Sequence, residues 1–413
     1  YQQNIWVKSI DLNKGTAKIY NENFFVPLDY VYAEYSVVVD GQEVENGKIS
    51  IPHIAPQDSV DVTIPASSID NYKDKEVFYN IQFRLKDNTP LLKANDIVAY
   101  QQFKIKDYDF TTTKNNILEN VNNKVEKEEQ LACLTLKSGN SSVTFNRHNG
   151  WIDYLDINNL PILEQGYQIK PDFWRAPTDN DCGAGFDHQL RAWENPGYEL
   201  KSFICDTIES NIRVVAEYDL KNVDSKLRMA YTMTPKGELK IEEKLTVNPE
   251  AKQKPMIPRF GLQLVMREPY NTINYYGRGP VENYCDRKNS QNVGIYTQSV
   301  SQQYWQYIRP QESGNKTDVR WWKLLDKNNT GLLFYAPNAM ECSAIQYLIS
   351  DLDCSRYSNT HSGDLTPRQF SVVHLQSKQM GLGCINSWGA WPSEQYRIPY
   401  SDQEFTVTIS PLY

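Results

Sequence analysis

The chain has 413 residues, of which 23% are charged and 40% hydrophobic, a composition typical of globular rather than disordered proteins. Its net charge of -8 favours attraction to neither nucleic acid nor anionic lipid, so we expect no nucleic-acid or membrane partner. The seven cysteines lack the spacing of a zinc site or a disulfide framework. Because the sequence does not begin with Met, we expect it to be part of a longer polypeptide.

Residues 1–106 show a pattern of short strands without helical periodicity. Asp40-Gly41 is a hairpin signal between β-rich runs. Further β-rich runs follow at 60–65, 76–86 and 97–106, with the spacing of strands and turns. About seven strands in about 100 residues predict an immunoglobulin- or fibronectin-like β-sandwich.

Residues 107–130 are polar and charged with few apolar positions, which predicts a linker between two domains. A short helix within 116–127 is an alternative for part of this segment. The strand pattern resumes at residue 131, and we assign 131–413 to a second domain.

Alternating apolar and polar residues dominate the second domain. Residues 211–220 alternate strictly, and residues 226–247 alternate on both sides of a turn at Pro235-Lys236-Gly237. Such alternation predicts antiparallel strands with one buried face, and so wide a region predicts two large stacked sheets. Residues 187–195 predict a short helix. Since strands do not alternate with amphipathic helices, the pattern excludes an α/β barrel and a dinucleotide-binding domain.

Four segments of the second domain combine glycine or proline with aromatic and hydrogen-bonding residues. They are "PDFWRAPTDNDCG" (171–183), "YYGRGPVENYCDR" (275–287), "RPQESGNKTDVRWW" (309–322) and "GLGCINSWGAWP" (381–392). One explanation is structural: ion pairs and amide side chains would satisfy the backbone hydrogen-bonding groups of irregular loops. A concave site for a neutral polyhydroxylated ligand would explain them as well, and the 12% aromatic content suits both interpretations.

The candidate site residues come from these segments. In the first segment we expect Phe173 and Trp174 to anchor the chain in the core, while its polar residues tie neighbouring loops together. Trp388 lies in a glycine-rich loop where a large ring can face a ligand. The candidate loop scaffold near the site comprises Arg175, Asp179, Asn180, Asp181, Glu282, Asn283, Arg287, Glu312 and Asn315.

Two of these candidates, Glu282 and Glu312, are loop-borne carboxylates of the kind that glycoside hydrolysis uses in pairs. The alternative is that each forms a buried ion pair with Arg278, Arg287 or Arg309.

The motifs "DFWRAPTDND", "YYGRGPVENYCDR", "PQESGNKTDVRWW" and "MGLGCINSWGAWP", in this order, resemble the C-terminal small-chain domain of bacterial β-galactosidases of glycoside hydrolase family 2. The N-terminal "YQQNIWV" and "IPHIAPQDSVDVTIP" resemble the β-sandwich that follows the catalytic barrel in these enzymes. The resemblance implies an all-β fold, with an immunoglobulin-like sandwich followed by a large antiparallel supersandwich related to galactose mutarotases.

The same resemblance implies that the catalytic glutamates lie in an upstream barrel, so we assign no catalytic residue here. We expect no cofactor and no metal site in this chain, and the resemblance implies that any magnesium or sodium ions would belong to the barrel. It implies that Trp388 reaches into the sugar site of the barrel. The loop here reads "INSW", so Asn386 replaces the usual acidic residue before Ser387. The expected partners are the barrel, a β-galactoside sugar and a second copy of the chain, in the cytoplasm or periplasm of a bacterium.

Three functional hypotheses follow. The first is a non-catalytic C-terminal portion of a β-galactosidase that adds a sugar-stacking tryptophan to the barrel site. The second is a mutarotase-like sugar epimerase, with Glu282 or Glu312 as base and His361 or His374 as acid. The third is a stand-alone carbohydrate-binding module that depends on Trp388.

Overall fold

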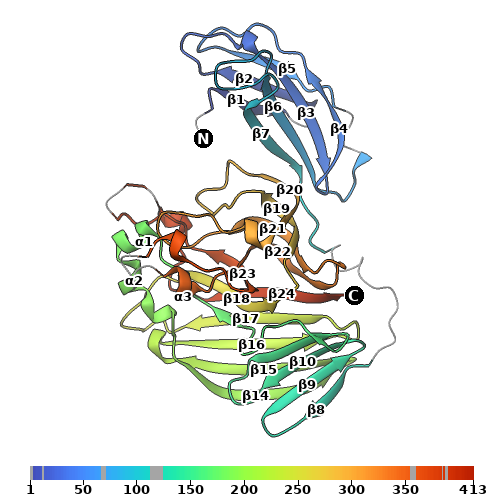
Figure 1. Cartoon of the computed structure of the whole chain (residues 1–413), viewed down its shortest axis with the longest axis vertical. Coiled ribbons are helices and arrows are strands. Elements are labelled where there is room, and N and C mark those ends of the chain that lie inside the picture. The colour runs from blue at the N-terminus through green and yellow to red at the C-terminus, as the bar shows by residue number, and fades with distance from the viewer. Residues whose placement is uncertain are drawn as a thin grey trace. The chain divides into compact units, whose positions relative to one another are not determined.

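The fold is known from a computed structural model, which describes residues 3–11, 14–66, 71–111, 124–353, 360–383, 385–386 and 389–413. The chain divides into two compact units, Tyr1–Thr112 and Thr113–Tyr413. In the described residues regular structure is almost entirely β-strand, which confirms the all-β prediction (Figure 1). The α-helices of the described chain are α1 (Asp179–Ala184), α2 (Phe186–Gln189) and α3 (Ile349–Leu352).

The first unit is a sandwich of two antiparallel sheets. One has the strand order β1-β2-β5 and the other the order β4-β3-β6-β7. Their strands are β1 (Ile5–Asp11), β2 (Thr16–Asn21), β3 (Val31–Val39), β4 (Gln42–Ile49), β5 (Ser59–Thr63), β6 (Val77–Leu85) and β7 (Ile97–Lys106). Buried side chains from both sheets form one hydrophobic core. The predicted hairpin joins β3 to β4, where Asp40 and Gly41 both have positive φ (46° and 80°), as a type I′ turn requires.

The second unit begins with a five-stranded antiparallel sheet in the order β12-β11-β10-β9-β8. Its strands are β8 (Glu126–Glu129), β9 (Cys133–Ser138), β10 (Ser141–Asn146), β11 (Ile152–Ile157) and β12 (Leu160–Pro161). Strand β8 lies inside the predicted linker, so the linker prediction is wrong for these residues. All four of its side chains are exposed, and an edge strand of this kind has no hydrophobic pattern to identify it. The alternative helix falls mostly on residues outside the described ranges.

A twelve-stranded sheet forms the rest of the second unit. Its main path runs β13-β18-β23-β22-β24-β17-β16-β15-β14, and β19, β20 and β21 extend it from β22. The 15-residue β22 pairs with β24 through its first half and with β23 through its second half. The strands are β13 (Lys170–Asp172), β14 (Tyr198–Ile208), β15 (Asn211–Leu220), β16 (Ser225–Met233), β17 (Leu239–Val247), β18 (Arg259–Arg267), β19 (Thr272–Gly279), β20 (Asn292–Ser299), β21 (Lys316–Leu325), β22 (Gly331–Ile345), β23 (Phe370–Gln379) and β24 (Gln403–Leu412).

The two sheets of the second unit share one core. The ring of Phe145 on β10 lies 6.2 Å from Phe203 on β14 and 5.0 Å from Tyr231 on β16, so the smaller sheet covers this part of the larger one. The predicted strands 211–220 and 226–247 are β15, β16 and β17, and the alternation that predicted them matches their burial. The helix predicted at 187–195 appears as the end of α2 and a 3-10 turn at Arg191–Trp193. The short helices gather at one end of the strands (Figure 1).

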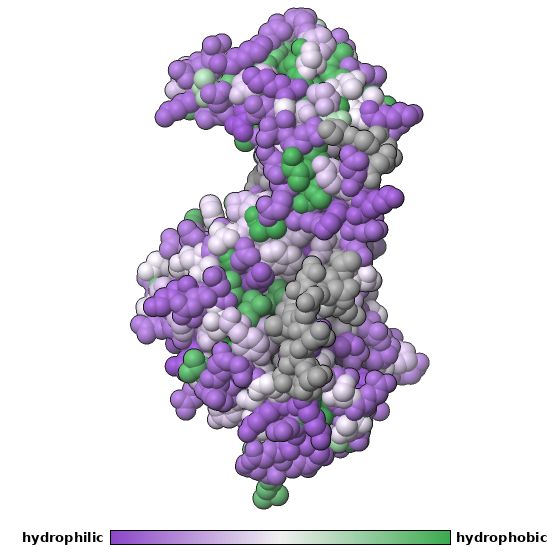
Figure 2. Space-filling model, turned by 90° about the vertical axis from the view of Figure 1, so that its right-hand side faces the viewer, coloured by the Kyte–Doolittle hydropathy of each residue, from purple (hydrophilic) through white to green (hydrophobic). Residues whose placement is uncertain are grey.

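On the face shown in Figure 2, hydrophobic residues form small patches among hydrophilic ones. Within the described residues, none of the helices has the length and apolar character needed to cross a membrane. The described cysteines are free thiols, and Cys342 is the buried one among them.

Candidate functional site

The first polar-aromatic segment runs from β13 into α1 and is anchored by its two large rings. Phe173 and Trp174 are 2% and 3% exposed and belong to the core of the second unit, as predicted. Trp174 packs on Phe186 of α2, with ring centroids 4.9 Å apart. The segment is therefore fixed on its apolar side, and its polar residues face the neighbouring loops.

Arg175 is the centre of the loop contacts in this segment. Its guanidinium is fully buried and donates to both oxygens of Asp181, at 3.1 and 2.8 Å. It also donates to the carbonyls of Met380 and Gly381, where the glycine-rich segment begins. Asp181 in turn accepts from the backbone N–H of Thr178 and so closes the capping box of α1. One buried cation therefore joins α1 to the 381–392 segment.

Asp179 and Asn180 lie nearer the surface of the same helix. Asp179 is exposed and accepts a 3.4 Å hydrogen bond from Gln311, which connects α1 to the third segment. Asn180 is half-buried. These two candidates are thus at the rim of the network, while Arg175 and Asp181 are inside it.

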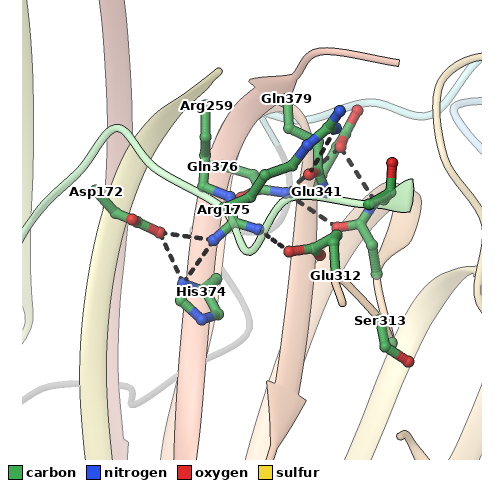
Figure 3. A network of polar contacts seen from close by, with 12 residues as sticks. Asp172, Arg175, Arg259, Glu312, Ser313, Glu341, His374, Gln376 and Gln379 are labelled. Atoms are coloured by element: carbon green, nitrogen blue, oxygen red, sulfur yellow. Dashed lines mark hydrogen bonds and ion pairs between the residues drawn. The ribbon is translucent and has the colours of Figure 1, made fainter. Parts of the chain in front are cut away.

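A second buried cation, Arg259 on β18, organises the centre of the network (Figure 3). It donates to Asp172 Oδ2 at 3.0 Å and to Glu312 Oε2 at 2.7 Å. His374 Nδ1 lies 2.7 Å from the same oxygen of Asp172, and it donates because a carboxylate only accepts. Burial opposes ionisation of Asp172, but Arg259 and His374 outweigh it and hold its pKa at about 2. Sequence reasoning missed Asp172 and Arg259.

Glu341 on β22 forms a third part of the network with two amides. Its Oε2 accepts from Asn315 at 3.1 Å and from Gln376 at 3.5 Å, while Gln376 also donates to Asn315 Oδ1 at 3.0 Å. Burial raises the pKa of Glu341 to about 7, although the hydrogen bond from Asn315 acts in the opposite direction. Its carboxyl group therefore changes protonation near neutral pH.

Asn283 and Asn315 join two loops through their side-chain amides, in addition to a backbone hydrogen bond from Asn283 N–H to the carbonyl of Asn315. Asn283 is fully buried, donates to the carbonyls of Arg278 and Val281, and accepts from the N–H and hydroxyl of Thr317. Asn315 donates to the carbonyl of Asn283 at 3.0 Å. These two candidates bring the second and third segments together.

The two loop-borne glutamates form ion pairs. Glu282 accepts from Arg287, Tyr307, Ser313 and the N–H of Gly314, so the expected Arg287 pair is present. Glu312 pairs with a cation that was not among its expected partners, Arg259 on β18. Of the other expected cations, Arg278 is bound to Asp318.

The glycine-rich segment passes closely over its neighbours. The N–H of Gly383 donates to Asp286 Oδ2 at 2.9 Å, and a Cβ at Gly381 would collide with the same carboxylate. Gly389 has a φ of +81°, and a Cβ there would collide with the Gly183 carbonyl of α1. Trp388 and Ser387 lie outside the described residues, so the structure places the two ends of the loop only.

Asn386 is exposed and accepts from the N–H of Ala390 at 3.3 Å. The two histidines considered as catalytic acids are in separate places. His361 is exposed beside Asp364, while His374 is buried on Asp172. Neither is hydrogen-bonded to Glu282 or Glu312. No group of His, Cys, Asp and Glu in the described part of the chain is arranged to hold a metal ion.

Comparisons with known proteins agree with this division into units. The family model "Beta galactosidase small chain" matches residues 137–409, and the model "Beta-galactosidase, domain 4" matches residues 17–106. The β-galactosidase of Priestia megaterium is 28% identical over 418 residues, covering 100% of this chain and 39% of that protein. The β-galactosidase of Lactobacillus delbrueckii subsp. bulgaricus is 29% identical over 409 residues, covering 98% of this chain and 38% of that protein.

The chain thus spans less than two fifths of the length of these relatives. Solved structures are less similar to this chain in sequence than these relatives are. A putative aldose 1-epimerase from Escherichia coli K12 has a TM-score of 0.38 and 9% identity, covering 68% of this chain and 99% of that one. A galactose mutarotase related enzyme from Lactobacillus acidophilus has a TM-score of 0.38 and 7% identity, covering 70% of this chain and 97% of that one.

Proposed function

Because the chain belongs to the β-galactosidase small-chain family, we propose that it forms the C-terminal, non-catalytic part of an enzyme that hydrolyses terminal β-D-galactosides. The match of the family model over residues 137–409 carries this proposal. The relatives continue well beyond the region shared with this chain, which leaves room in the parent enzyme for a catalytic barrel.

The ion pairing of the loop carboxylates supports a non-catalytic role. Glycoside hydrolysis needs one carboxyl group free to give a proton and a second free to attack or to activate water. Glu282 has Arg287 and three further donors on its two oxygens, and Glu312 is held by the buried Arg259. Carboxylate oxygens that already accept these hydrogen bonds are not free to reach the leaving-group oxygen or a water of a bound sugar. We therefore assign the reacting acids to the barrel.

In this proposal the chain contributes the aromatic ring of Trp388 to the sugar site. An indole face packs on the apolar C–H face of a pyranose, and it needs a rigid loop to be presented in the right place. The described ends of the loop are fixed to their neighbours. The N–H of Gly383 donates to Asp286, and Gly389 packs closely against Gly183 of α1. Arg175 adds a buried hydrogen bond to the carbonyl of Gly381.

The test is the kinetics of the full-length enzyme on a nitrophenyl β-galactoside. Trp388→Ala should lower kcat/KM by at least about tenfold, because a stacking contact of about 1.4 kcal/mol or more is lost. Trp388→Phe keeps an aromatic face and should retain most of the activity. Equal kcat/KM values for the parent and Trp388→Ala would remove the sugar-binding role from this residue.

A further inference from the structure

A cavity of about 420 Å³ opens in the second unit beside β13, β18 and α3. This volume lies within the range of small-molecule sites. Its described lining residues all lie between residues 151 and 350, outside the 381–392 segment. The described wall of the cavity therefore comes from other parts of the chain than the glycine-rich segment.

Aromatic rings form much of its wall. Trp151 and Tyr198 meet edge to face with centroids 5.1 Å apart, and Phe173 lies 5.4 Å from Trp193. Trp174 also lines the cavity. Walls of this kind offer flat apolar faces to a ligand while leaving hydrogen-bonding edges for its polar groups.

Polar groups without protein partners open onto the same cavity. Asp172 is 4% exposed, and both Arg259 and His374 bind its Oδ2, so its Oδ1 makes no hydrogen bond with a described residue. The Tyr198 hydroxyl also makes no hydrogen bond with any residue that the structure describes.

A buried polar group without a partner costs free energy unless a ligand or water satisfies it. Here one acceptor, Asp172 Oδ1, and one donor, the Tyr198 hydroxyl, converge on an aromatic cavity, and Gln263 on β18 adds an amide with no hydrogen bond inside the described chain.

The charges favour a neutral ligand. Arg259 compensates the negative charge of Asp172. The other two charged residues of the described lining, Lys170 and Glu194, have opposite signs. Neither an anion nor a cation therefore gains from a net charge.

We propose that this cavity binds a neutral pyranose sugar, whose ring packs on the aromatic wall. Its hydroxyl groups donate to Asp172 Oδ1 and accept from the Tyr198 hydroxyl and the Gln263 amide. A hydroxyl group can do both, which is why a polyol matches this mixed set of one acceptor and two donors.

The test uses the 413-residue chain labelled with ¹⁵N and follows its indole N–H resonances during titration with methyl β-D-galactopyranoside or methyl β-D-glucopyranoside. At least one sugar should shift the Trp174 resonance with a saturable dependence. Tyr198→Phe should weaken this binding about three- to tenfold, which corresponds to the loss of one neutral hydrogen bond. Its urea unfolding midpoint should stay at the parent value, since the hydroxyl has no protein partner to lose.

Gln263→Leu provides a second variant, and Tyr154→Phe, an exposed tyrosine on β11 outside the cavity, provides the matched control. Trp388→Ala should leave the affinity unchanged, which separates this site from the function proposed above. The inference is overturned if neither sugar shifts the Trp174 resonance at about 100 mM, a concentration that would fill even a millimolar site. It is also overturned if Tyr198→Phe and Gln263→Leu both bind as the parent does.

Discussion

Replacing Arg175 by methionine tests the role of the buried network most sharply. The guanidinium is fully buried and donates to Asp181 and to the carbonyls of Met380 and Gly381. Methionine fills similar space but leaves the Asp181 carboxylate, 2% exposed, without its cation. Breaking a buried pair from one side costs about 3–5 kcal/mol. We therefore expect Arg175→Met to lower the free energy of unfolding of the second unit by about 4 kcal/mol.

The assay is urea unfolding followed by tryptophan fluorescence. Trp6 belongs to the first unit and the other eight of the nine tryptophans belong to the second, so the signal reports mainly on the unit that contains Arg175. Arg213→Met is the matched control, because Arg213 pairs with Glu242 at the surface of the same unit, where both side chains are about one third exposed. That pair should contribute less than about 1 kcal/mol.

A double variant separates the charge from the packing. Arg175→Met combined with Asp181→Asn removes the unpaired negative charge of Asp181 and keeps an acceptor for the N–H of Thr178. It should regain at least about 1 kcal/mol of the loss. The reasoning fails if Arg175→Met destabilises no more than the Arg213→Met control, or if the double variant is no more stable than the single one.

Three further predictions concern buried groups of the second unit. Glu341→Gln should stabilise the protein by an amount that grows from about pH 4 to pH 7 and is constant above pH 7. Burial raises the pKa of Glu341 in the folded state to about 7, so between these pH values only the unfolded state loses the proton. The free energy of unfolding of the parent protein therefore falls across this range, and that of the variant does not. Glu243→Gln should give a gain that likewise grows as the pH rises above about 4, by up to a factor of ten in the folding equilibrium per pH unit, because burial and then the charge of Asp172 raise the pKa of Glu243 well above its usual value. A gain that is independent of pH in urea titrations would contradict both predictions. Asn283→Ala should cost about 3 kcal/mol, since it removes the hydrogen bonds of a fully buried amide to three backbone groups, whereas the exposed Asn271→Ala should cost less than about 0.5 kcal/mol in the same assay.

The strands with one solvent-exposed face could be predicted from the sequence because the burial of their side chains follows a two-residue period. Strands β15, β16 and β17 show this most clearly. The same period places Glu243 between the buried Ile241 and Leu245, so the sequence contains the signal for a buried carboxyl group that we did not use. Strand β8 carries four exposed residues and pairs at an edge, so no hydrophobic pattern could identify it.

The polar network could be predicted only where its partners are close in sequence. Glu282 and Arg287 are five residues apart on one loop, and their pair was among the expected ones. Arg259 binds residues that are 87 and 53 positions away, Asp172 and Glu312. Such contacts depend on how β13, β18 and the 309–322 loop come together, and no local pattern encodes this.

The most direct test of the central claim is the rate at which the purified 413-residue chain hydrolyses a nitrophenyl β-galactoside. We predict no hydrolysis above the buffer rate, because the loop carboxylates of this chain are bound to cations and the reacting acids belong to the barrel. Hydrolysis that increases with protein concentration and disappears in Glu282→Gln or Glu312→Gln would contradict the account, since it would place the reacting acids in this chain.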